Sequence, residues 1–257
     1  MQERDVRTNS YKVGLDDSAR ILSQFELLAD LDRQAQQQMA VHMHRHVYPA
    51  DHVIVLAGEP SRAVYLIARG TVRIQRSSPQ GREYVLHSLG AGQCFNLSSA
   101  LDGGYNLATV TTLTDTVAYA IPVDVFRQVV SEHPELAMAL LEHLASRVRH
   151  LCDAVEDLAL YTVRTRLARC LLSPTNGDLP AVKYWTQGEL AAHIGTVRDV
   201  VGRTLRTFSR EGLIRRERGR VVVTDPAGLR REALREQEPQ YAALSSGNQH
   251  KEFAYAH

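Results

Sequence analysis

The sequence predicts an α+β protein in which a small β domain, one long helix and a C-terminal helical domain follow one another. Three observations predict it. Short apolar runs separated by glycines fill residues 45–123, a heptad pattern follows Pro134, and two short amphipathic helices with a strand pair follow Thr186. We divide the 257 residues into five segments: a flexible N-terminus (1–19), a β domain (20–133), a dimerisation helix (134–160), a winged helix-turn-helix (161–235) and a flexible tail (236–257).

The β domain is predicted from runs of about five residues that end at glycines. Regularly spaced short strands with glycine turns are typical of a sandwich or a barrel-like roll. We expect the strands at Val53–Leu56, Ala63–Ala68, Thr71–Gln75, Tyr84–Leu89, Ala108–Thr112 and Thr116–Ile121. The preceding segment Leu22–Met39 is expected to be helical.

The helix that begins at Pro134 carries an apolar seam with alternating spacings of four and three residues. Valine or leucine at one seam position and mainly leucine at the other favour a parallel two-stranded coiled coil. We therefore expect a homodimer, the alternative being that this face packs on its own domain. The seam consists of Ala137, Leu141, Leu144, Val148, Leu151, Val155 and Leu158.

Residues 186–210 predict two helices joined by a turn at Gly195. Thr186 with Glu189 fits the capping box that begins a helix, and Thr196 with Asp199 repeats the pattern. In the second helix an inward apolar face is expected from Val201, Leu205 and Phe208. Glu211-Gly212 ends this helix, and Leu213-Ile214, a basic turn at 215–220 and Val221–Val223 predict the strand pair of a wing.

The outward face of the second helix predicts contacts in the DNA major groove. Arg198, Asp199 and Arg203 are the candidates for base contacts, since Arg suits guanine and a carboxylate accepts from cytosine. We interpret Gly202 as a place where backbone approaches DNA closely. The candidates for phosphate contacts are Thr186, Arg206, Arg210, Arg218 and Arg220.

The charge distribution supports the same assignment. The whole chain has a formal charge of +1, but residues 161–235 hold 15 Lys/Arg against 7 Asp/Glu, whereas residues 1–160 hold 14 against 19. Only the C-terminal segment is therefore expected to meet phosphate. Two such domains on a parallel dimer helix would read half-sites about 34–36 Å apart.

Other classes of protein find little support. No apolar run approaches the ~20 residues that span a membrane, and the polar N-terminus is not a signal peptide, so we expect a cytoplasmic protein. The cysteines, Cys94, Cys152 and Cys170, show no metal-ligand spacing and are interpreted as packing residues. An enzyme is not expected, because the spacings of GxSxG, HExxH and the P-loop do not occur.

On these residues the chain resembles the family of bacterial transcription factors that comprises the cyclic-AMP receptor protein and the fumarate–nitrate regulator (CRP/FNR). The resemblance covers roughly residues 20–233. It implies an N-terminal β-roll of the cyclic-nucleotide-binding type (a double-stranded β-helix), a dimerisation helix, a palindromic site related to TGTGA…TCACA, and RNA polymerase as a further partner. The matching segments are Tyr65–Val72, Gly81–Glu83, Gly92–Phe95, Ser99–Leu101, Ala108–Val110, the dimer helix and the winged helix.

The recognition helix and the effector pocket both depart from the family pattern. The family's Arg-Glu-x-x-x-Arg is present as Arg198-Asp199-Val200-Val201-Gly202-Arg203, with the shorter carboxylate. Where cyclic-nucleotide binders carry the Glu that holds the ribose, the Arg that pairs with the phosphate and the adjacent Ser, this sequence has Leu97, Asn106 and Leu107. The hydroxyl pair of the dimer helix is replaced by Leu151 and Cys152, and no buried cation is evident from the sequence.

We therefore expect ordinary cyclic-AMP binding to be lost. The pocket would hold an uncharged or hydrophobic effector, or would be a filled core in a regulator that needs none. Its expected residues are Phe95, Asn96, Leu97, Ser98, Ser99, Asn106, Leu107, Leu151 and Cys152.

Cofactors are not predicted, and haem is the alternative that stays open. An iron–sulfur cluster would need cysteines before Cys94, and the places of the Cys and His ligands of the carbon-monoxide sensor hold Asn96 and Ser98. His42, His44 and His46 would share one face of a strand and could bind a metal or haem, although we favour a solvated surface. The functional rival is a signalling module without DNA binding, which would not bind a palindromic duplex.

Overall fold

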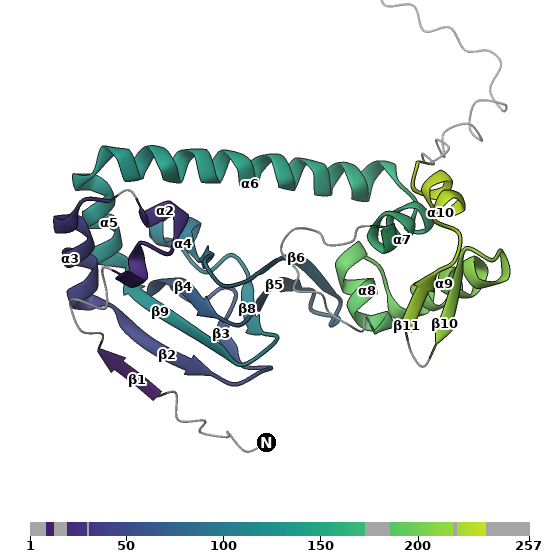
Figure 1. Ribbon diagram of the computed structural model, residues 1–257, viewed down its shortest axis with the longest axis horizontal. Helices are drawn as coiled ribbons and strands as arrows, with labels where there is room; N and C mark the ends of the chain where they lie inside the picture. Colours follow the sequence, from purple (N-terminus) through teal and green to yellow (C-terminus); the bar gives the residue numbers. More distant parts are fainter. Residues whose placement is uncertain (1–8, 13–19, 30, 173–185, 218–219, 235–257) are drawn as a thin grey trace, which may run out of the picture.

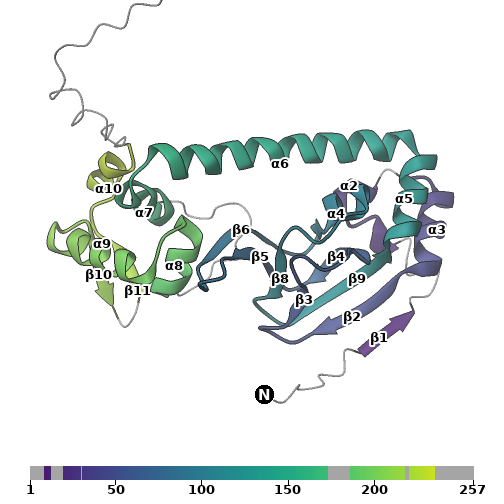
Figure 2. The same ribbon diagram turned by 180° about the vertical axis from the view of Figure 1, so that it is seen from behind.

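The computed structural model of the protein has three successive parts: a β domain, one long helix and a helical domain (Figure 1). The structure describes residues 9–12, 20–29, 31–172, 186–217 and 220–234, with the backbone alone at 9–12 and 220. A β domain lies under one end of the long helix and a smaller helical domain under the other end, as both views show (Figures 1 and 2). The α+β fold class predicted from the sequence is confirmed.

The β domain consists of two antiparallel sheets. One sheet has the strand order β1-β2-β9-β4-β7 and the other the order β3-β8-β5-β6. The strands are β1 (Asn9–Lys12), β2 (His44–Tyr48), β3 (Val53–Val55), β4 (Ala63–Arg69), β5 (Val72–Ser77), β6 (Glu83–Leu89), β7 (Cys94–Phe95), β8 (Thr109–Thr112) and β9 (Thr116–Pro122). Side chains from both sheets form a core inside the roll: Val55, Ile67, Val72, Leu89, Phe95 and Val110.

Every strand expected from a glycine-bounded run is present to within one or two residues, and three strands were not expected. β1 lies inside the segment interpreted as a flexible N-terminus, where its backbone pairs with β2 in the register Asn9 to Val47. β7 has only two residues, and β2 has no alternating pattern, because its first three side chains are all half-buried and only Tyr48 at its end is buried. Glycine turns in the sequence mark the ends of the longer strands, but they do not reveal short strands at the edge of a sheet.

Helices close one end of the roll and pack on a second apolar core. They are α2 (Glu26–Ala29), α3 (Arg33–His42), α4 (Leu97–Asp102) and α5 (Val123–Glu132). The expectation of helix over Leu22–Met39 was only partly right, because the segment is broken before α3. Asp32 begins a new helix there, since its carboxylate accepts from the backbone amide of Ala35 at 2.7 Å.

The long helix is α6 (Pro134–Leu160), a single element of 27 residues with Pro134 in its first turn. At 1.5 Å per residue it is about 40 Å long. Only Leu136 and Leu140, near its N-terminus, are buried in the β domain. Five residues of the heptad seam stay exposed in the single chain: Leu141, Val148, Leu151, Val155 and Leu158.

The C-terminal domain is a helical cluster with a strand pair. Its elements are α7 (Val163–Leu172), α8 (Gln187–Ile194), α9 (Arg198–Arg210), β10 (Ile214–Glu217), β11 (Arg220–Val223) and α10 (Pro226–Ala233). The core joins Leu167, Leu190, Leu205, Phe208 and Leu229 from four helices. α10 was not predicted, although Asp225 caps it through the amide of Gly228 and Pro226 begins it, a start signal visible in the sequence.

Candidate nucleic-acid interface and sensor cavity

The turn between α8 and α9 is fixed by backbone hydrogen bonds. α8 begins with the expected capping box, in which the Thr186 hydroxyl accepts from the amide of Glu189 and the Glu189 carboxylate accepts from the amide of Thr186. It ends at Gly195, whose φ of 66° lies in the left-handed region that favours glycine. The amide of Thr196 donates to the carbonyl of Ala191 at 2.9 Å, and this bond fixes the direction of α9 relative to α8.

The expected second capping box does not form. The N-cap of α9 is Val197, without a side-chain hydrogen bond, and helix begins at Arg198. The backbone bond of Thr196 to α8 holds that residue in the turn, one residue before the N-cap position. The start of α9 is thus set by the turn rather than by a polar cap.

α9 has one buried and one charged face. Val201, Leu205 and Phe208 are buried, as expected from their spacing. The opposite face is exposed and consists of Arg198, Asp199, Arg203, Arg206 and Arg210. Among the described residues, no carboxylate forms an ion pair with these four arginines, so their positive charge is directed at solvent.

Gly202 does not serve the role that the sequence suggested. It is buried, and a Cβ at this position would lie 3.0 Å from the Gln187 side-chain oxygen. The glycine therefore permits close packing of α9 on α8, and it is not a point of backbone approach to DNA.

The strand pair after α9 has the form of a wing. β10 and β11 are antiparallel, with Ile214 opposite Val223 and Glu217 opposite Arg220. Arg215 and Arg216 are exposed on this hairpin. Arg218 lies outside the described residues, and Arg220 is described by its backbone alone, so their phosphate contacts remain predictions.

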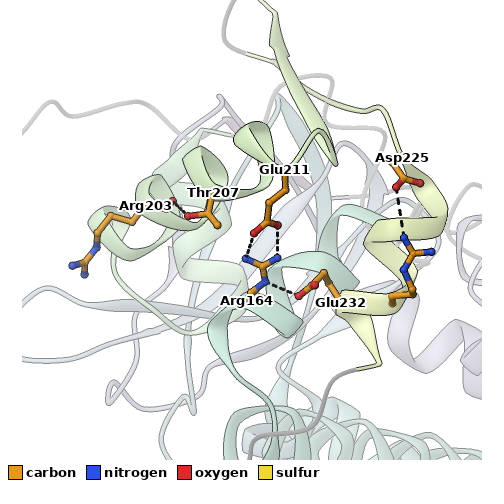
Figure 3. A network of polar contacts seen from close by, with 7 residues as sticks. Arg164, Arg203, Thr207, Glu211, Asp225 and Glu232 are labelled. Atoms are coloured by element: carbon orange, nitrogen blue, oxygen red, sulfur yellow. Dashed lines mark hydrogen bonds and ion pairs between the residues drawn. The ribbon is translucent and has the colours of Figure 1, made fainter.

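Arg164 holds the helical domain together behind α9 (Figure 3). Its guanidinium donates to both carboxylate oxygens of Glu211, at the end of α9, and its Nε donates to Glu232 of α10 at 2.5 Å. These hydrogen bonds raise the pKa of Arg164. The Arg203 side chain extends away from this network (Figure 3), which leaves it available for an external partner.

The helical domain meets the β domain at strand β6. Gly195 packs there so closely that a Cβ would lie 2.7 Å from Leu158 Cδ2 and 3.2 Å from Tyr84 Cε2. Beside this contact is a cavity of about 380 Å³, the interdomain cavity, lined from β6, α6, α7 and α8. Among its residues are Tyr84, His87, His150, Arg166 and His193.

A second cavity, the sensor cavity, lies between the roll and α6 and has a volume of about 240 Å³. Seven of the nine residues predicted for the effector pocket line it: Phe95, Asn96, Leu97, Ser98, Ser99, Leu107 and Leu151. Asn96 is held at its edge, since its amide donates to Ser61 and to the carbonyl of Ala63.

The other two predicted residues lie outside this cavity. Asn106 is buried, and its side chain donates to the carbonyl of Leu56 while its backbone bonds to Gly58 and Glu59. It therefore holds the loop at residues 56–59 and does not line the cavity. Cys152 is exposed one residue beyond Leu151, about 100° further around the helix, and does not line the cavity. Its interpretation as a packing residue was wrong.

The expectation that this region lacks a cation was also wrong. Arg147 of α6 is half-buried and lines the sensor cavity, as do His87, His143 and His150. One guanidinium nitrogen of Arg147 lies 2.5 Å from His87 Nε2. This placement was not predictable, because Arg147 lies next to the seam position Val148, where a charged side chain is expected to face solvent.

The histidines before the roll form no metal site in the described part of the chain, where no group of three His, Cys, Asp or Glu is placed to hold an ion. His42 ends α3, while His44 and His46 belong to β2. His46, Tyr48 and His52 stack in a column, with ring centroids 5.8 and 5.3 Å apart. Burial, and secondly the charge of His44, lowers the pKa of His46, so this surface is less solvated than expected.

The described helices include none with the length and apolar character required to cross a membrane.

Two family profiles match the chain. The profile of the cyclic nucleotide-binding domain covers residues 45–133, and that of the Crp-like helix-turn-helix domain covers residues 165–232. They thus fall on the β domain and on the helical domain, and α6 lies between them.

Three relatives of known name are similar to most of this chain. The CRP-like cAMP-activated global transcriptional regulator of Mycobacterium tuberculosis is 32% identical over 193 residues, which is 72% of this chain and 86% of the relative. The cyclic AMP receptor protein of Thermus thermophilus is 32% identical over 188 residues, covering 73% and 87%. The cAMP-activated global transcriptional regulator CRP of Haemophilus influenzae is 30% identical over 190 residues, covering 71% and 84%.

Solved structures share the fold. The crystal structure of a crp/fnr-family transcriptional regulator from Eubacterium rectale has a TM-score of 0.71 at 22% identity, covering 82% of this chain and 99% of its own. The c-di-GMP-responsive global regulator of Xanthomonas campestris has a TM-score of 0.65 at 22% identity, covering 75% and 99%.

Proposed function

Because the chain belongs to the CRP/FNR family of transcription regulators, we propose that it binds a palindromic DNA site as a homodimer and is controlled by an effector other than cyclic AMP. The observation that carries the proposal is the exposed arginine face of α9. An amphipathic helix whose outer face holds four arginines and no paired carboxylate is suited to the major groove.

The contacts to DNA divide into two classes. Arg198, Asp199 and Arg203 lie on the first half of α9, where base edges are reached, and we assign them to bases. The residues assigned to phosphates surround this set: Thr186, Arg206, Arg210, Arg218 and Arg220. Thr186 is exposed at the N-terminus of α8, a position at which a phosphate is favoured by the helix dipole.

The second copy of the chain is assigned to the exposed seam of α6. Leu141, Val148 and Val155 are each more than half exposed in the single chain, which is unfavourable for apolar side chains that lie in one row. A parallel partner helix would cover this row and would place two α9 helices about 34–36 Å apart along one face of DNA.

The sensor cavity supports loss of ordinary cyclic-AMP binding, although the relatives named above are cAMP-activated. Leu97 is buried where a carboxylate would hold the ribose, and Asn106 is turned into a loop where an arginine would pair with the phosphate. The sensor cavity, with a volume of about 240 Å³, supports control by a ligand other than cyclic AMP. A family member regulated by its abundance alone would bind no added ligand in this cavity. A haem-bearing variant would be purified with haem bound.

The test is binding of a labelled palindromic duplex, followed by fluorescence anisotropy at several salt concentrations. We expect Arg203→Ala to weaken the specific duplex by about 1–3 kcal/mol and a scrambled duplex much less. Arg230→Ala, which removes an exposed arginine from α10, is the matched control and should change neither. Equal loss on both duplexes would contradict the base contact, and no binding to any duplex would favour a signalling module.

A further inference from the structure

The sensor cavity has an apolar interior. Leu89, Phe95, Leu97 and Val110 line it and are buried, and Leu144 and Leu151 of α6 close the opposite side. Its 240 Å³ would hold about eight water molecules at the ~30 Å³ that each occupies in the liquid. This space suits a small molecule with an apolar body, since burying apolar surface is the main favourable term.

Arg147 is the permanently charged side chain among the residues that line the same cavity. Three histidines, His87, His143 and His150, also line it, and no Asp or Glu is among the lining residues. Within the described part of the chain, Arg147 forms no ion pair with a carboxylate, and one of its guanidinium nitrogens lies 2.5 Å from His87 Nε2. Since a guanidinium has only donors, His87 Nε2 is the acceptor and His87 is neutral in this contact.

Arg147 lines the cavity together with the buried thiol of Cys94. Burial raises the pKa of the Cys94 thiol to about 12, and the positive charge of Arg147 acts on the same thiol in the opposite direction. Cys94 itself lines the cavity and is 8% exposed. Arg147 and Cys94 thus line the same cavity, and Arg147 is half-buried there, where a positive charge without a counterion is less favourable than in water.

We propose that the sensor cavity binds a small monoanion with an apolar body, such as a carboxylate on an alkyl chain or an aromatic ring. The carboxylate pairs with Arg147 in a charge-assisted contact. The apolar body lies over Leu89, Phe95 and Val110. This inference rests on the proposed effector control and names the chemical class of the effector.

The test compares each acid with the alcohol of the same carbon skeleton, using calorimetric titration of the full chain. The probes are octanoate against 1-octanol, phenylacetate against 2-phenylethanol, and cyclic AMP as a third ligand. We expect at least one acid to bind tenfold or more tightly than its alcohol, and cyclic AMP not to bind. Equal affinity for acid and alcohol, binding of cyclic AMP alone, or no binding of either acid at millimolar concentration would each overturn the proposal.

Variants locate the anion. Arg147→Gln should remove the tenfold preference for the acid while the alcohol binds as before, and Arg147→Lys should retain part of the preference. Arg149→Gln, at an exposed position two residues along the same helix, is the matched control and should retain all of it. An acid preference that survives in Arg147→Gln would contradict the assignment. If Arg147→Gln does not fold, the acid–alcohol comparison on the unaltered chain still decides the ligand class.

Binding of the palindromic duplex is measured on the same preparations, so that the two proposals can fail separately. A chain that binds the duplex but neither acid is a regulator with a different ligand or none. A chain that binds an acid but no duplex is a sensor without the proposed DNA function.

Discussion

Replacing Gly195 with alanine tests how tightly the helical domain is joined to the β domain. The substitution has two effects, because Gly195 has a φ of 66° and its Cβ would enter the contact between Leu158 and Tyr84. The left-handed backbone alone costs an alanine about 1–2 kcal/mol. Overpacking adds about 1 kcal/mol, at the low end of its usual range, since Leu158 is 40% exposed and can rotate.

Gly212 provides the matched control. It has a φ of 75°, but nothing lies within 4 Å of a Cβ placed there, so Gly212→Ala carries the backbone cost without the contact. We expect Gly195→Ala to lower the free energy of unfolding in urea by about 1 kcal/mol more than Gly212→Ala does.

A double-mutant cycle with Leu158→Ala isolates the contact, since the smaller side chain makes room for the new methyl group. Most of the extra loss at Gly195 should then disappear, because only the 3.2 Å approach to Tyr84 Cε2 remains. Equal destabilisation at the two glycines, or an extra loss that Leu158→Ala does not reduce, would refute the close packing at Gly195.

Two further predictions concern the helical domain. Arg164→Met should lower the free energy of unfolding by about 1–3 kcal/mol, because it removes the ion pair between Arg164 and the carboxylate of Glu232, which is 13% exposed. Arg215→Met removes an exposed pair with Glu217 and should cost less than about 1 kcal/mol; similar losses in urea unfolding would show that the Arg164 pairs contribute little. Burial lowers the pKa of His193, so as the pH falls the unfolded chain takes up this proton first. Stability should therefore decline below about pH 6.5, the ordinary pKa of histidine, and His193→Gln should flatten that decline; an unchanged pH profile would contradict this.

The parts of the fold that local patterns determine were predictable from sequence. The period of Val201, Leu205 and Phe208 identified the buried face of α9, and the capping box of Thr186 marked the start of α8. Both signals act within one or two helical turns, so they do not depend on where the rest of the chain lies.

The parts that depend on tertiary contacts were not predictable. Gly202 reads equally well as a site of DNA approach or of helix packing, and only the position of Gln187 decides for packing. Asn106 was placed in the pocket by its alignment with a family position, yet its hydrogen bonds to residues 56–59 turn it away. Arg147 was overlooked because its cavity exists only once α6 lies against the roll.

Strand β6 has a consequence for how the two domains communicate. Tyr84, Leu86 and His87 line the sensor cavity and also the interdomain cavity. A ring that turns to admit a ligand on one side thereby changes the space available on the other, next to α8. If a ligand binds as proposed, its effect would need to cross only the width of a single strand, within one chain.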